Sequence, residues 1–277
     1  MTWLPLAAFA LAVWSGQRVV TKAALVSWST ARFYRWTAIC SLAAYIPFAV
    51  VVPPERAAFG GAFALSLLMA LTFYVTTEAT RRGPVGLVSP LTATSPALTA
   101  ALAVAVLGER PDPLAELGIA LAVIAAALLA FRPAAAGPAE RWVPLALASA
   151  ILQGVGAFIA KVVVTEGGPT TLLLLGALVQ LVVGAVLARR EPLVLADQLR
   201  GRALVVTLTL VAAAVATIGY LSALTVGPAS IIVPFVATSP SLGGLAGIVL
   251  LRERFSARQL VGILLGLVSV VLLARAG

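Results

Sequence analysis

The residues with the clearest chemical potential are Trp14, Arg18 and Lys22, which follow one another at four-residue intervals in an apolar stretch. In a helix they share one face, and Ser15 lies beside it. An arginine in hydrocarbon costs at least ~2.5–3.5 kcal/mol, so it normally faces a cavity or a partner. This face could bind a carboxylate or phosphate, with the indole as a cation–π surface. Alternatively, Arg18 snorkels to the interface beside Lys22.

Four further polar or aromatic residues lie in other apolar stretches. Gln153 and Gln180 are neutral hydrogen-bonding groups that could line a cavity or join neighbouring helices. Tyr74 and Tyr220 could be cavity aromatics or interface anchors. The sequence leaves both alternatives open for each pair.

Glu78 is a candidate proton-coupling carboxylate near the end of an apolar stretch. The competing interpretation is a pair with Arg81 or Arg82 at helical spacing, which would place the carboxylate at the interface.

Two segments each contain two prolines with a Thr-Ser dipeptide between them. They are Pro90, Thr94, Ser95 and Pro96 in one and Pro234, Thr238, Ser239 and Pro240 in the other. Proline interrupts helical hydrogen bonding, and interrupted helices at membrane depth occur where other groups or cavity water satisfy the backbone. These segments either line a pathway and flex during transport, or form static kinks with hydroxyl-to-backbone bonds.

Composition indicates which elements must position these residues. The chain has 277 residues, of which 61% are hydrophobic and 10% are charged, whereas a soluble domain is about 25% charged. A membrane-spanning helix needs about 20 mostly apolar residues. We therefore predict an all-α polytopic membrane protein and exclude a soluble globular enzyme. The ten expected spans are 3–25, 30–52, 60–80, 84–107, 112–131, 142–164, 169–188, 202–225, 228–251 and 256–274.

An internal repeat divides these spans into two sets. Residues 83–110 and 227–254 are identical at 11 of 28 positions. Trp3, Pro5 and Lys22 recur as Trp142, Pro144 and Lys161. Residues 1–133 and 140–277 are therefore predicted to be two copies of one five-helix unit.

Because five is odd, the second copy must enter the membrane from the opposite side, which is the inverted-repeat plan of many secondary transporters. Of the 19 Lys and Arg residues, 14 lie in the odd-numbered connections. The positive-inside rule places these connections in the cytoplasm and both termini outside. We expect Lys22 and Lys161 to be interface anchors, and Glu109 and Glu253 to cap or pair within their own connections.

The second copy carries Ala223-Leu224-Thr225-Val226-Gly227-Pro228, then Pro234 and Glu253; the first carries Gly83-Pro84, Pro90 and Glu109, after a Trp14-Ser15-Gly16 block and Lys22. With these features the chain resembles the EamA repeats of the drug/metabolite transporter superfamily. The resemblance implies a bacterial inner-membrane carrier, often an exporter of amino acids or related metabolites, with a central cavity between the halves. Such a likeness does not choose the substrate.

Absent residue types also limit the function. The chain has no histidine, which excludes imidazole-based zinc sites and proton relays. It also lacks a Walker motif. We expect no enzymatic activity, no metal and no cofactor. The basic residues behind the net charge of +9 lie in short connections between apolar stretches, so we assign them to membrane orientation and expect no nucleic-acid partner. The expected partners are the bilayer and a small solute, and the expected carrier is monomeric.

These observations favour a secondary transporter that exports small amphipathic metabolites by alternating access. The alternative is a flippase for a lipid-linked or polyprenyl-phosphate substrate held by Trp14, Arg18 and Lys22. A third hypothesis is a structural or assembly protein of the membrane without transport.

The charge pattern makes a testable prediction about orientation. A reporter fused to the C-terminus should lie outside the cytoplasm, because the basic connections remain inside. Paired alkaline-phosphatase and fluorescent-protein fusions measure this directly, and a C-terminal reporter in the cytoplasm would overturn the orientation.

Overall fold

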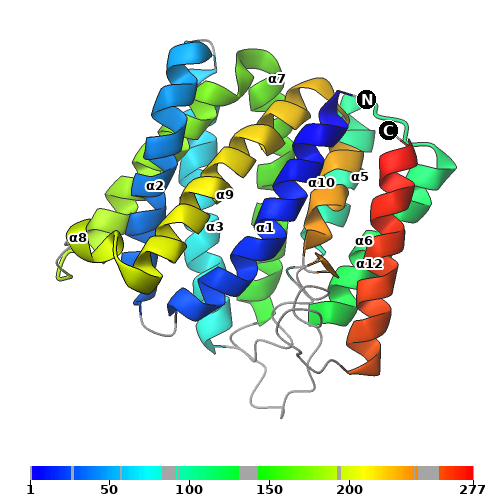
Figure 1. Cartoon of the computed structure of the whole chain (residues 1–277). Coiled ribbons are helices and arrows are strands. Elements are labelled where there is room, and N and C mark those ends of the chain that lie inside the picture. The colour runs from blue at the N-terminus through cyan, green and yellow to red at the C-terminus, as the bar shows by residue number, and fades with distance from the viewer. Residues whose placement is uncertain are drawn as a thin grey trace.

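The computed structural model is a bundle of helices that run side by side, with both chain termini at the same end (Figure 1). It describes residues 2–25, 28–56, 58–82, 92, 94–130, 143–191, 195–239, 241–242 and 256–276. The helices are α1 (Trp3–Leu25), α2 (Thr30–Val51), α3 (Phe59–Arg82), α5 (Ser95–Leu107), α6 (Pro113–Ala130), α7 (Val143–Leu187), α8 (Leu195–Gln198), α9 (Gly201–Val226), α10 (Ala229–Ala237) and α12 (Ala257–Ala276).

Helix α7 covers 45 residues, but its backbone leaves helical geometry at Gly167 and Gly168. Gly168 has φ of +66°, a left-handed conformation that glycine adopts at little cost. The interruption falls between the predicted spans 142–164 and 169–188, so α7 contains two helical segments. Its first segment packs on α3 and α5, and its second packs on α2.

The other predicted spans agree with the helices within about two residues, except that 84–107 and 228–251 correspond to the shorter helices α5 and α10. The first parts of 84–107 and the last parts of 228–251 lie outside the described residues, as do Pro90 and Pro240. The short helix α8 was not predicted.

Two of the four prolines that were predicted to interrupt a span, Pro96 and Pro234, lie in the described residues. Pro96 lies in the first turn of α5, where a missing N–H costs nothing because those donors have no partner within the helix. Pro234 lies inside α10, which continues to Ala237. The helix thus continues for three residues past Pro234 and then ends, within the predicted span 228–251, just as α5 begins only at Ser95 within the predicted span 84–107.

Polar contacts and close approaches join the helices, as expected where lipid tails give no hydrophobic drive for association. The Ser269 hydroxyl donates to the Gly118 carbonyl at 2.7 Å between α12 and α6. The Trp36 indole donates to Thr207 Oγ1 at 2.9 Å between α2 and α9. Where α7 crosses α2, a Cβ on Gly184 would lie 2.8 Å from the Arg35 Cα. Glycine at this crossing therefore lets two backbones meet.

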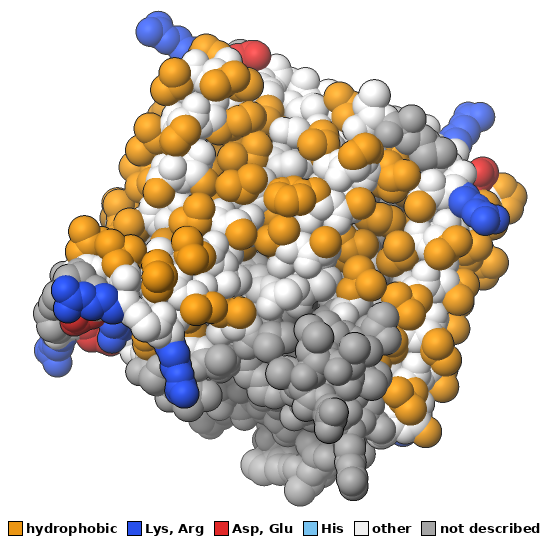
Figure 2. Space-filling view, in the orientation of Figure 1, with side chains coloured by type: hydrophobic (Ala, Val, Ile, Leu, Met, Phe, Trp, Pro, Cys, Tyr) orange, Lys and Arg blue, Asp and Glu red, His pale blue; other side chains and the backbone are white. Residues whose placement is uncertain are grey.

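The outer surface is rich in exposed hydrophobic side chains. Figure 2 shows them spread over the sides of the bundle, with Lys and Arg at its ends. Val50, Val182 and Leu264, from three different helices, are 79%, 64% and 61% exposed. In the described part of the chain, four helices are long and apolar enough to cross a membrane. The protein is a multi-pass membrane protein.

The α2–α7 crossing makes a stability prediction. Gly184→Ala should lower the melting temperature in detergent, because the added methyl meets the α2 backbone and overpacking costs about 1–3 kcal/mol. Gly16→Ala is the matched control, since a Cβ there meets no atom within 4 Å. It should be neutral or stabilising by up to ~1 kcal/mol. Equal loss of stability in both variants would contradict the close approach.

Candidate functional site

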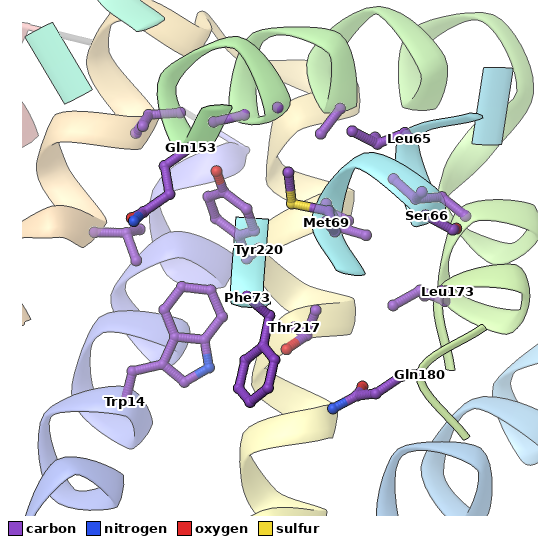
Figure 3. Close-up of a pocket in the computed structure, with 18 of the residues that line it drawn as sticks. Trp14, Leu65, Ser66, Met69, Phe73, Gln153, Leu173, Gln180, Thr217 and Tyr220 are labelled. Atoms are coloured by element: carbon purple, nitrogen blue, oxygen red, sulfur yellow. The ribbon is translucent and has the colours of Figure 1, made fainter. Parts of the chain in front are cut away.

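A cavity of about 570 Å³ lies in the middle of the bundle, within the range of about 300–1,000 Å³ that is usual for small-molecule sites. Its walls come from α1, α2, α3 and α5 of the first sequence copy and from α7, α9 and α10 of the second. Figure 3 shows side chains from several of these helices directed into the same space. The cavity is therefore built jointly by the two copies.

Several residues singled out in the sequence lie in its wall. They are Trp14, Ser95, Pro96, Gln153, Gln180, Tyr220 and Ser239. Others do not line it: Ser15 is buried and donates to the Leu11 carbonyl, Thr94 is exposed, and Thr238 is buried and bonded to the Phe235 carbonyl. The side chains of Arg18, Lys22, Tyr74 and Glu78 lie outside the described part of the structure.

Aromatic rings form two parts of the wall. The Trp14 and Tyr220 ring centroids are 5.3 Å apart, with their planes tilted by 54°. This pair joins α1 to α9. The Trp14 indole also donates to the Ala213 carbonyl at 3.4 Å, which fixes its edge. Tyr34 and Phe73 stack with centroids 4.0 Å apart and join α2 to α3. The rings thus offer apolar faces already held in place by contacts within the protein.

Gln153 belongs to a hydrogen-bond network between α7 and α3. Its amide nitrogen donates to Ser149 Oγ at 2.9 Å and to Thr76 Oγ1 at 3.4 Å. The two hydroxyl oxygens lie 2.6 Å apart. Within the described residues these bonds engage the amide nitrogen, and the carbonyl oxygen is the end of Gln153 that can accept a further hydrogen bond.

Gln180 lies on the second segment of α7. Figure 3 shows its amide directed toward Phe73 and Thr217. The described residues provide this amide with no hydrogen-bond partner, whereas Thr217 Oγ1 donates to the Ala213 carbonyl at 2.9 Å. Gln180 therefore presents both a donor and an acceptor to the cavity.

All described side chains that line the cavity are uncharged. Recognition by them rests on hydroxyl and amide dipoles beside aromatic and aliphatic surfaces. These groups can hold an amphipathic molecule, but they form no nucleophile–base pair of the kind that covalent catalysis uses. Within the described ranges, no three metal-ligating side chains come together.

The sequence analysis did not select Tyr34, Ser66, Met69, Phe73 and Thr217, which also line the cavity. The sequence pattern that could have identified them is helical spacing, which places residues on one helix face. Ser66, Met69 and Phe73 lie three and four residues apart, and Thr217 precedes Tyr220 by three. This spacing identifies a face, but in a helix that is apolar all round it does not show whether the face meets a cavity or lipid.

A family model described as the EamA-like transporter family matches the chain twice, over residues 1–131 and 140–275. One solved structure, described only as "Crystal structure of protein", has a TM-score of 0.80 and 16% sequence identity, and the match covers 98% of this chain and 96% of that one. At this identity the likeness concerns the fold alone. No curated protein matches the chain.

Proposed function

The chain belongs to the EamA-like transporter family, and from this premise we propose that it is a secondary transporter that exports small amphipathic metabolites such as amino acids. Membership makes it a transporter of the drug/metabolite transporter superfamily, with the bilayer as its environment and a small solute as its cargo. The observation that carries the finer proposal is the central cavity with walls from both repeats.

Two repeats around one cavity support alternating access. If the five-helix copies are inverted in the membrane, rocking one against the other exposes the same site first to one side and then to the other. Trp14 and Tyr220 belong to different copies, and their rings are in contact, with centroids 5.3 Å apart. A solute bound against this pair would therefore contact both copies.

The side chains that line the cavity support an amphipathic solute as the transported substrate. In this proposal the rings of Trp14 and Tyr220 contact the apolar part of the solute, and the amides of Gln153 and Gln180 bind its polar groups. A site built mainly of apolar walls with a few placed polar groups is typical of small-molecule recognition. Ser95 and Ser239 add hydroxyl groups, one from each copy.

The charge pattern supports an orientation with both termini outside the cytoplasm. The inner membrane is the location that the family resemblance implies. Export is the direction that the family resemblance favours. Comparison of extracellular and cytoplasmic metabolites in cells with and without the protein tests both the direction and the solute class.

The direct test is transport by purified protein in liposomes loaded with a panel of amino acids and related metabolites. Saturable release of at least one solute is expected. Failure to move any member, while a fluorescent lipid or polyprenyl-phosphate analogue crosses the bilayer in the same vesicles, would replace the proposal with the flippase alternative.

Substitutions of residues that line the cavity should weaken transport, and the effect should grow with the interaction energy of the contact that is removed. We expect Trp14→Ala to raise the apparent KM about two- to tenfold, as losing an aromatic contact of ~0.5–1.5 kcal/mol implies. Gln180→Ala should act similarly through a lost hydrogen bond of ~0.5–1.5 kcal/mol.

The matched controls are Trp28→Ala and Gln259→Ala, which make the same substitutions away from the cavity. Trp28 stacks on the Arg32 guanidinium, and Gln259 caps the start of α12. Initial transport rates over a range of solute concentrations give the comparison. Equal effects in the wall and control variants would count against a substrate role for the wall.

A further inference from the structure

The turn between α9 and α10 is held by two charged side chains from distant parts of the chain. It consists of Gly227 and Pro228, which connect Val226 to Ala229. The turn exposes the last carbonyls of one helix and the first N–H groups of the next, and neither set has partners within its own helix.

Glu109 binds the N-terminus of α10. Its two carboxylate oxygens accept from the backbone N–H groups of Ala229 and Ser230, each at 2.8 Å. A carboxylate at this position also complements the positive end of the helix dipole. Glu109 belongs to the first copy and α10 to the second, so the contact joins the two halves. The expectation that Glu109 caps or pairs within its own connection was wrong, because these unpaired N–H groups lie within its reach.

Lys161 binds the other side of the same turn. Its ammonium donates to the Leu224 carbonyl at 2.6 Å and to the Gly227 carbonyl at 2.9 Å. A cation there complements the negative end of the α9 dipole. Lys161 therefore binds the end of α9, a contact that its sequence position did not indicate, and its role as an interface anchor stays a prediction.

The two charges lie on the side of the cavity that faces the α9–α10 turn. Leu221 and Val233 line the cavity, and Leu224 and Ile232, each one turn or less nearer the Gly227 turn, are 0% exposed. The Trp3 ring packs against this turn and meets the Phe235 ring edge-on at 5.8 Å. This buried layer separates the cavity from the end of the molecule that carries both termini, seen at the top of Figure 1.

The same layer contains polar atoms that do not favour closure. Trp3 Nε1 and Ser230 Oγ are buried, and the described residues give them no hydrogen-bond partner. A buried donor without a partner destabilises the state that buries it. Closure at this end thus depends on the other contacts of the layer, among which the charged hydrogen bonds of Glu109 and Lys161 are the strongest kind.

We propose that Glu109 and Lys161 are gating residues of the transport cycle: they hold the termini-side end of the cavity closed, and both must release the Gly227–Pro228 turn before that end can open. The inference rests on the proposed alternating-access function. To that function the inference adds the two residues whose hydrogen bonds keep the cavity closed at its termini-side end.

The sequence supplies independent support, since it repeats the same set of residues. Gly83-Pro84 and Glu253 recur at the offset of the internal repeat, and Lys22 is the counterpart of Lys161. The side chains of this second set lie outside the described part of the structure.

Cysteine accessibility tests the gate without knowledge of the substrate. In a Cys40→Ser background, Ala157→Cys places a single thiol in the cavity wall, and Thr2→Cys places one on the exposed N-terminal segment. A membrane-impermeant maleimide is applied to spheroplasts and to inside-out vesicles. The side from which the Thr2→Cys thiol reacts identifies the termini side.

We expect Glu109→Gln and Lys161→Gln to increase the labelling rate of the cavity thiol from the termini side about tenfold or more, as loss of a charged hydrogen bond implies. Lys161→Arg, which keeps the charge, should retain most of the protection. Glu116→Gln is the control, because it makes the same substitution at an exposed carboxylate in the first turn of α6.

Unchanged labelling from the termini side in both Glu109→Gln and Lys161→Gln, in protein that elutes as a single species, would overturn the gating role. If Glu109→Gln does not fold, Glu109→Asp provides the test: its shorter side chain keeps the charge but should not reach both N–H groups, and labelling must still rise. Altered accessibility in a protein that moves no solute of the panel would sustain the gate and reject the proposed transport activity.

Discussion

The structure depends on one constraint of the bilayer: hydrocarbon offers no hydrogen bonds, so every backbone polar group at membrane depth must find a partner within the protein or in a water-filled cavity. Uninterrupted helices meet this requirement by themselves. Hydroxyl side chains within them, such as Ser66 and Thr72, donate to the carbonyl four residues earlier. The requirement becomes difficult where a helix ends inside the protein, because its terminal N–H and C=O groups then have no partner within the helix.

The α9–α10 turn is such a place, and its solution determines how the halves are joined. Glu109 and Lys161 supply the acceptors and donors that the helix ends lack. Because their partners are backbone groups, the contacts depend on where the turn lies and not on which side chains it carries. A charged side chain can bind these backbone groups strongly, and it loses all of its hydrogen bonds to them together when the turn moves. Closure and release at this end of the cavity then follow from the same constraint that shapes the bundle.

The architecture could be predicted from the sequence to a large extent because span length and hydropathy are local properties. The repeat at 83–110 and 227–254 indicated two units, and the family match covers both. Gln153, Gln180 and Tyr220 were selected because polar and aromatic groups are conspicuous in apolar stretches, and they line the cavity. In contrast, Tyr34 and Phe73 could not be selected, because an aromatic ring in an apolar helix suits lipid, core and cavity equally well.

Long-range contacts also escaped prediction. Glu109 meets its partners 120 residues away, and nothing in its local sequence distinguishes it from a loop carboxylate. At Pro234 a local rule indicates an interruption, and α10 ends three residues after the proline, at Ala237.

The central claim is that the two repeats move against each other around the cavity. It is tested most directly by electron–electron distance measurements between spin labels at Asp112 and Glu166, which are exposed positions in different copies. The protein is reconstituted in nanodiscs, with Cys40 replaced by serine. The account predicts two distance populations, with a ratio that changes when a transported solute is added. A single narrow distribution that stays the same with and without solute would contradict it.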